Sequence, residues 1–317
     1  MSLEETLLRE RQRSNLTGIT SYELSASSTS SVRLLVPAGT SIFVVDYQPP
    51  ASLHVDELVA PHVALGAQWN ADGSMLAFVG ANELWVALAP REFNHDARAV
   101  GGDTNVPPTA EQASVSSAPM HQRMIQVSNS GARCGRTAGV AEYILQEEFD
   151  RYHGFWWSPK GASSRDCYHI LYFEVDESAV LRYQVSNVDL DGTSETHKYP
   201  LAGGRNATTV VNLATVAYDK LTGWQVSHST LWPPLHERAP WVEYIPSAGW
   251  SPDGTRVWMQ LLDRQQQVCA SHLLAGTPVH ERERSIDRSN SPSLVGVAAI
   301  VAVARVVRLG GLSSCAC

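Results

Sequence analysis

Two adjacent carboxylates are the residues of this chain best suited to chemistry. Glu147 and Glu148 lie within residues 146–157, a run that also holds five Phe, Tyr or Trp side chains. Neighbouring like charges repel each other, and aromatic surroundings increase that repulsion by lowering the local dielectric. Such a pair is stable on an open surface, the usual place for charged side chains, or opposite a cation. A free peptide amino terminus is a suitable cation, because its three donors match two carboxylates.

Other kinds of site have little support in the sequence. His153 lies near Asp150, but two candidate ligands do not complete a metal shell, so we expect no metal. No glycine-rich phosphate loop follows a predicted strand, and we expect no cofactor. The five cysteines form no C-x-x-C pair, which argues against both a zinc site and a disulfide framework.

Composition and charge narrow the class of protein. The 317 residues are 44% hydrophobic and only 18% charged, and nine Trp and ten Tyr favour a β-rich fold. The formal net charge of −8 makes nucleic acid a poor partner. Residues 1–13 are charged throughout and do not resemble a secretory signal. We therefore expect a cytoplasmic protein with reduced cysteines and no membrane or nucleic-acid partner.

A short helix and many short strands are expected along the chain. Good helix formers fill residues 3–13. Strand-like runs bounded by turn residues follow at 32–36, 41–45, 75–79 and 84–88.

A weak internal repeat is compatible with the spacing of propeller blades. A Trp, a tight turn and a return strand recur at Trp69, Trp157 and Trp250, which lie 88 and 93 residues apart. Each interval fits two propeller blades of roughly 40–50 residues. The pattern indicates an all-β fold and is compatible with a β-propeller, and an ordinary β-sandwich is the alternative.

Two regions do not resemble blades. Residues 101–138 are rich in Gly, Ser, Pro, Ala and Thr and are expected to form a loop or a disordered insert. Residues 284–317 are expected to be an irregular tail, whose apolar stretch 294–307 is too short to cross a bilayer. The expected division is a helical segment at 1–17, a propeller region at 18–283 and this tail.

Three blocks of sequence resemble a known family. The most specific runs from Ala138 to Trp157 and continues into residues 170–178, while residues 7–22 and 242–264 are supportive. Together they are similar to the amino-terminal propeller region of the dipeptidyl peptidase IV family, a resemblance that implies a partial β-propeller of about four to six antiparallel blades. The similarity is greatest to its cytosolic branch, dipeptidyl peptidases eight and nine, and it ends near residue 267.

The resemblance implies a role for the paired carboxylates. In this family a double glutamate projects from the propeller and holds the free amino terminus of the substrate, and the matching positions are Glu147 and Glu148. Arg151 lies in the same segment and is named as a further substrate contact. The family consists of serine-type peptidases that release Xaa-Pro or Xaa-Ala dipeptides, so the implied partners are peptide amino termini and a hydrolase domain.

The chain departs from the family where the chemistry would occur. The family's nucleophile lies in a G-x-S-x-G elbow, and this sequence contains none. We therefore predict no catalytic residue and no activity for this chain alone. Two alternatives remain open, namely a non-catalytic propeller that binds partners and a truncated fragment of a gene model.

Overall fold

The computed structural model describes most of the chain up to residue 275. The residues described are Thr6, Leu8, Glu10, Arg11, Ile19, 21–25, 32–48, 52–89, 123–130, 135–159, 167–186, 194–219, 221–232, Glu237, 239–275 and 307–308. Most of the expected tail and residues 101–122 of the expected insert lie outside this set. Thr6, Leu8, Glu10 and Arg11 are helical, as the helix expected at residues 3–13 requires.

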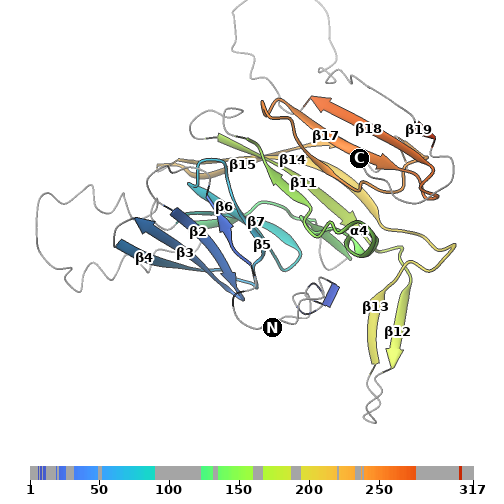
Figure 1. Ribbon diagram of the computed structural model, residues 1–317, viewed down its shortest axis with the longest axis horizontal. Coiled ribbons are helices and arrows are strands. Elements are labelled where there is room, and N and C mark those ends of the chain that lie inside the picture. Colours follow the sequence, from blue (N-terminus) through green and yellow to red (C-terminus); the bar gives the residue numbers. More distant parts are fainter. Residues whose placement is uncertain are drawn as a thin grey trace, which may run out of the picture.

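Four antiparallel sheets follow one another along the chain (Figure 1). The first contains β1 (Glu23–Leu24), β2 (Val32–Ala38), β3 (Ser41–Gln48) and β4 (Ser52–Val59). The second contains β5 (Leu65–Trp69), β6 (Met75–Gly80), β7 (Glu83–Leu88) and β8 (Met124–Gln126). The third contains β9 (Arg136–Ala138), β10 (Phe155–Trp157), β11 (Cys167–Asp176), β14 (Thr208–Asp219) and β15 (Gly223–Trp232). The fourth contains β16 (Ala248–Trp250), β17 (Arg256–Leu262), β18 (Val268–Ala275) and β19 (Val307–Arg308).

Two further elements depart from this plan. A two-stranded hairpin, β12 (Arg182–Ser186) and β13 (Ser194–Lys198), projects from the third sheet at the bottom of Figure 1. The short helix α4 (Tyr143–Phe149) lies between β9 and β10 in the sequence.

The sheets pack face to face, and each junction has its own hydrophobic core. Leu35 of the first sheet packs with Phe78 of the second. The next core joins Val79 to Phe155 of the third sheet, and a further core joins Phe173 to Met259 of the fourth. Successive four- or five-stranded sheets stacked in this way are propeller blades, so the predicted partial propeller of four to six blades is confirmed with four.

The predicted strands and turns are largely confirmed. All four strand-like runs lie within β2, β3, β6 and β7. In the repeat, Gly73 and Gly254 adopt φ of +74° and +68° in the turns after Trp69 and Trp250, the left-handed conformation that such turns require of glycine. The turn after Trp157 lies outside the described residues.

The prediction of a loop or insert at residues 101–138 is wrong at its carboxyl end. Residues 124–126 form β8 and residues 136–138 form β9. Each is only three residues long and gains its stability by pairing with a longer strand, β7 or β11. So short a segment carries no periodic signal, and its composition concealed it.

Candidate functional site

The segment that carries the two carboxylates is an excursion from the third sheet. β9 and β10 both pair with β11, so the chain leaves the sheet at Gly139 and returns at Gly154. The two ends are joined by a bridge between Val140 and His153 and by a 2.8 Å hydrogen bond from the Gly154 N–H to the Gly139 carbonyl. This closed base fixes where α4 emerges from the sheet.

Side-chain and backbone caps define both ends of α4. The Glu142 carboxylate accepts a 2.5 Å hydrogen bond from the Ile144 N–H, which satisfies one of the free donors of the first turn. At the other end Asp150 adopts φ of +51° and its N–H donates to the Leu145 carbonyl. Aspartate is one of the few residues that tolerate this left-handed conformation. The helix is thus limited to two turns.

The apolar side of α4 faces the fourth sheet. Leu145 is buried in a small core with Tyr244 and Leu262, and the ring of Phe149 lies 6.0 Å from that of Tyr244. Packing of this kind, rather than intrinsic propensity, stabilises so short a helix. It leaves Glu147 and Glu148 exposed.

The amino-terminal helical residues brace α4 from another side. The Arg11 guanidinium donates a 2.8 Å hydrogen bond to the side-chain carbonyl of Gln146 and lies 5.0 Å from the centre of the Tyr143 ring. Gln146 is buried and also donates to the Ala141 carbonyl. Residues more than a hundred positions apart in the sequence therefore hold the helix in place.

Glu147 lines a cavity of about 540 Å³ between α4 and the hairpin β12–β13, which we call the tyrosine cavity. Its other lining residues are Glu10, Arg11, Tyr143, Tyr183, Val185, His197, Tyr199 and Leu201. The rings of Tyr143 and Tyr199 meet edge to face at 5.2 Å. Burial and the charge of Glu147 raise the pKa of Tyr143, so this hydroxyl stays protonated and can donate. An anionic, aromatic-walled cavity of this kind suits a cation.

Glu148 does not line the tyrosine cavity. It is exposed next to Glu147, and neither carboxylate forms a hydrogen bond or ion pair with another residue in the part of the chain that the structure describes. Both therefore keep their full capacity to accept hydrogen bonds from a ligand.

Arg151 lies in the interior behind the helix. The residue is 6% exposed, and its guanidinium donates a 2.8 Å hydrogen bond to the His153 carbonyl and lies 5.4 Å from the Phe173 ring. Its Nε and Nη2 atoms have no hydrogen-bond partner among the described residues. Burial lowers its pKa to about 10. The contact between Arg151 and substrate stays a prediction, and this position supplies no exposed donor for it.

Sequence reasoning missed Glu142. This carboxylate is buried beneath α4, and burial raises its pKa to about 7, although the hydrogen bond from Ile144 and the charge of Arg151 act in the opposite direction. Glutamate is not among the usual helix caps, so no local pattern marks Glu142 as one. The tyrosines of the hairpin were also missed, because only the fold brings them to α4.

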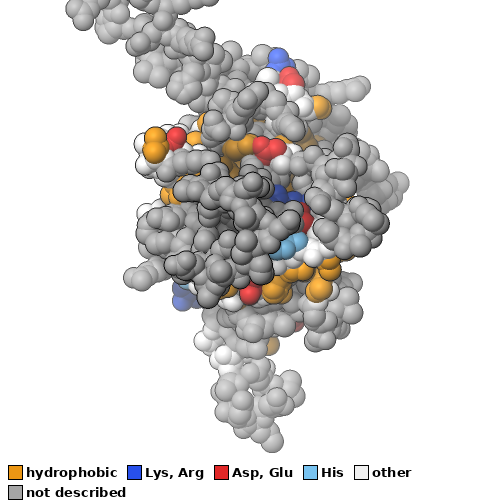
Figure 2. Space-filling view, turned by 90° about the vertical axis from the view of Figure 1, so that its left-hand side faces the viewer, with side chains coloured by type: hydrophobic (Ala, Val, Ile, Leu, Met, Phe, Trp, Pro, Cys, Tyr) orange, Lys and Arg blue, Asp and Glu red, His pale blue; other side chains and the backbone are white. Residues whose placement is uncertain are grey.

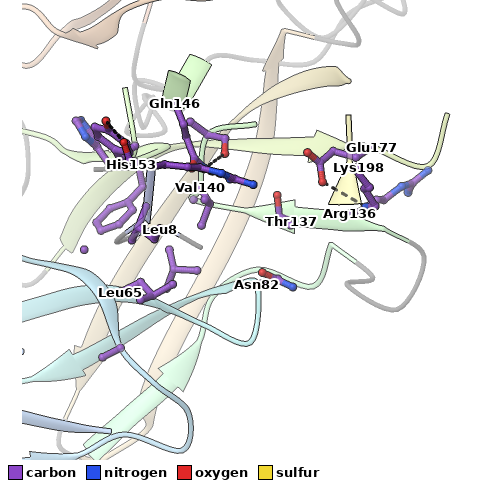
Figure 3. A pocket seen from close by; sticks show the side chains of 18 of the residues that line it. Leu8, Leu65, Asn82, Arg136, Thr137, Val140, Gln146, His153, Glu177 and Lys198 are labelled. Carbon is purple, nitrogen blue, oxygen red and sulfur yellow. Dashed lines mark hydrogen bonds and ion pairs between the residues drawn. The ribbon is translucent and has the colours of Figure 1, made fainter. Parts of the chain in front are cut away.

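A second cavity, of about 580 Å³, shares the lining residues Arg11 and His197 with the tyrosine cavity. Figure 3 shows this second cavity from close by. Gln146, Val140 and His153 lie at one end, and an Arg136, Glu177 and Lys198 cluster lies at the other. The Lys198 ammonium pairs with Glu177 at 3.3 Å. Burial and the charge of Arg151 lower the pKa of His153, which is therefore neutral near pH 7. Among the described residues, no group of three or more His, Cys, Asp or Glu side chains could hold a metal.

Comparison with known proteins identifies the class. The family described as "Dipeptidyl peptidase IV (DPP IV) N-terminal region" matches residues 116–292, which include α4 and the two carboxylates. Together with four stacked antiparallel sheets, this match shows that the chain belongs to that family.

The similar proteins are dipeptidyl peptidases. Dipeptidyl peptidase 8 of Mus musculus is 31% identical over 282 residues, covering 84% of this chain and 28% of the relative. The Homo sapiens protein of the same name matches with the same figures. The crystal structure of Porphyromonas gingivalis dipeptidyl peptidase 4 has the same fold, with a TM-score of 0.50 at 20% identity over 83% of this chain and 32% of that one. The chain thus spans 28% of the length of the curated relatives.

No helix in the part of the chain described by the structure is long and apolar enough to cross a membrane. The cytoplasmic location expected from the sequence stays a prediction.

Proposed function

We propose that this chain is the portion of a serine-type dipeptidyl peptidase that binds the amino terminus of the peptide substrate. In this proposal Glu147 and Glu148 together accept hydrogen bonds from the ammonium group of a peptide substrate. The observation that carries the proposal is the exposure of two adjacent carboxylates that have no partner among the described residues. They lie on a helix fixed at both ends, and Glu147 lies on the wall of the tyrosine cavity.

The physical case rests on rigidity and charge. α4 is capped by Glu142, closed at its base by the Val140–His153 bridge and packed on Tyr244, so the backbone that carries the carboxylates needs little ordering when a ligand binds. Their mutual repulsion is relieved by a cation, and each charged hydrogen bond is stronger than a neutral one. An acetylated amino terminus lacks the charge and two of the donors.

In the complete enzyme, this pair of carboxylates, which we call the clamp, would set which peptide bond is cleaved. Fixing the ammonium group at a set distance from the nucleophile selects the bond that follows the second residue, and this orientation can supply several kcal/mol of the barrier reduction. The acyl-transfer step itself would belong to a Ser, His and Asp triad in a separate hydrolase domain. This chain would supply substrate orientation and no reacting group, so we expect no Xaa-Pro release from it alone.

Isothermal titration with a short Xaa-Pro peptide tests the proposal. The free-amine peptide should bind at least about ten times more tightly than its acetylated form, a difference of about 1.4 kcal/mol. Glu147→Gln combined with Glu148→Gln should abolish that preference. Glu57→Gln is the control, because it removes an exposed carboxylate from β4, in the first sheet and away from the tyrosine cavity, and should leave the preference intact. Equal binding of the two peptides by the unmodified chain would refute the clamp and favour a non-catalytic interaction protein.

A further inference from the structure

Two buried ionisable side chains face each other beneath α4. The segments before and after this helix run antiparallel from the bridge between Val140 and His153, and a backbone hydrogen bond of 3.2 Å joins the next residues of the two segments. Glu142 and Arg151 each lie two residues beyond the bridge, which places them opposite each other on one face. Both residues are buried, with exposures of 8% and 6%.

No hydrogen bond or ion pair joins these two side chains in the part of the chain that the structure describes. The Glu142 carboxyl group instead accepts from the Ile144 N–H, and the Arg151 guanidinium donates to the His153 carbonyl. Arg151 Nε and Nη2 have no partner among the described residues. A neutral Glu142 accounts for this arrangement, because a protonated carboxyl group does not attract the guanidinium as a charge would. Burial, which raises the pKa of Glu142 to about 7, favours the neutral form.

Three further titratable groups lie near this pair. The charge of Glu177, just after β11, raises the pKa of Glu142, and this carboxylate is paired with Lys198 at 3.3 Å. Burial raises the pKa of Tyr244, which precedes β16, so its hydroxyl stays protonated. Burial lowers the pKa of His153, which is neutral near pH 7. Glu142 is therefore the member of this group whose charge changes near pH 7.

We propose that Glu142 and Arg151 form a proton-linked pair that adjusts the affinity of the clamp. Glu142 keeps its proton while the clamp is empty and releases it to solvent when a peptide amino terminus binds at Glu147 and Glu148. The resulting carboxylate pairs with Nε and Nη2 of Arg151, whose fork geometry matches the two carboxylate oxygens. This role rests on the proposed function, because the ammonium group held by the clamp supplies the charge that favours ionisation.

The coupling between the two sites is electrostatic. Glu142 caps the helix that carries Glu147, and their positions differ by about 8 Å along its axis at a rise of about 1.5 Å per residue. At a separation on the order of 10 Å and an effective dielectric of about 20, an added positive charge favours ionisation of a carboxyl group by on the order of ten-fold. This change lowers the pKa of Glu142 by about one unit. The bound state then holds fewer protons than the empty one, so affinity rises with pH through this window.

Isothermal titration at about pH 6.5, in phosphate and again in MOPS, measures the protons released, because the two buffers take up protons with different heats. Binding of a free-amine Xaa-Pro peptide should release about half a proton per peptide. The amino group of the peptide, with a pKa of about 8, would take up protons on binding and so gives the opposite sign. The affinity should rise about three-fold from about pH 6 to about pH 7.5.

Two variants identify the source of the proton. Glu142→Gln should still bind the free-amine peptide, with neither proton release nor a rise in affinity with pH. Arg151→Met removes the partner of the ionised carboxylate and should at least halve the release, whereas a merely structural role for Arg151 would leave the release unchanged. Circular dichroism should show that both variants are folded.

A surface carboxylate provides the control. Acidic side chains lie at several separate places on the surface (Figure 2). Glu57→Gln removes an exposed carboxylate from β4, in the first sheet, and should leave the release unchanged. If the unmodified chain prefers the free amine but releases no proton, or if Glu142→Gln releases as many protons, the proton linkage is refuted and the clamp stands. If the chain shows no preference for the free amine, the clamp itself fails, and the proton-linked pair fails with it.

Discussion

Replacement of Glu142 by glutamine should change how stability depends on pH. Glu142 has a pKa of about 7 in the folded protein instead of the ordinary 4.5, chiefly because it is buried. Between these two values the unfolded chain has lost the proton that the folded chain retains. The folded state therefore binds more protons, and stability falls as pH rises through this window.

The size of the effect follows from the two pKa values. One unit corresponds to about 1.4 kcal/mol, so ionisation of Glu142 costs the folded protein about 3 kcal/mol in all, of which about 2.5 kcal/mol falls between pH 5 and pH 8. The Glu142→Gln variant has no proton to lose, and its amide oxygen can still accept the hydrogen bond from Ile144. The difference in free energy of unfolding between the variant and the unmodified chain should therefore shift by about 2.5 kcal/mol in favour of the variant from pH 5 to pH 8.

Urea unfolding of both proteins at about pH 5 and pH 8 measures the difference. Subtraction removes the contributions of titrating groups that do not interact with Glu142. The effects of the nearby charges of Glu177, which raises the pKa of Glu142, and of Arg151, which lowers it, are already contained in its value of about 7. A second variant, Glu142→Ala, loses the cap as well and should be about 1 kcal/mol less stable than Glu142→Gln at both pH values. If the difference between the unmodified chain and Glu142→Gln is the same at both pH values, the carboxylate is not buried as described.

Three other substitutions test the packing of the chain. Gly139→Ala should cost at least about 2 kcal/mol, because this residue has φ of +81° and its new Cβ would lie 2.8 Å from Val79 Cγ2. Gly66→Ala, with φ of +59° and open space around it, should cost only about 1 kcal/mol, and equal losses in urea unfolding would contradict the clash. Arg151→Met should leave stability within about 1 kcal/mol or raise it, since this buried cation leaves two nitrogens unpartnered, whereas a loss above about 3 kcal/mol would mean that its contacts outweigh its desolvation.

The sequence alone determined the class of fold and the segment of interest. Apolar alternation and turn residues are local properties, so β2, β3, β6 and β7 could be predicted. The Trp-turn-strand repeat indicated blades for the same reason, and the resemblance to the family pointed to Glu147 and Glu148 before any coordinate was known. Family membership is now shown by the comparisons.

Tertiary structure decided the surroundings of the two carboxylates. Both carboxylates are exposed, and only Glu147 borders the tyrosine cavity. Arg151, close in sequence, lies inside the protein instead. The direction of a side chain depends on which face of α4 meets the fourth sheet, and that is fixed by contacts with Tyr244, about a hundred residues away.

Long-range contacts likewise determined what no local pattern encodes. Arg11 meets Gln146 and Tyr199 meets Tyr143 only because the chain folds back on itself. The pairing registers of β1 to β4 likewise determine which residues of the first sheet share a face. Alternation in a sequence shows that a strand has two faces, but burial of each face depends on which neighbour covers it, and this is a property of the assembled sheets.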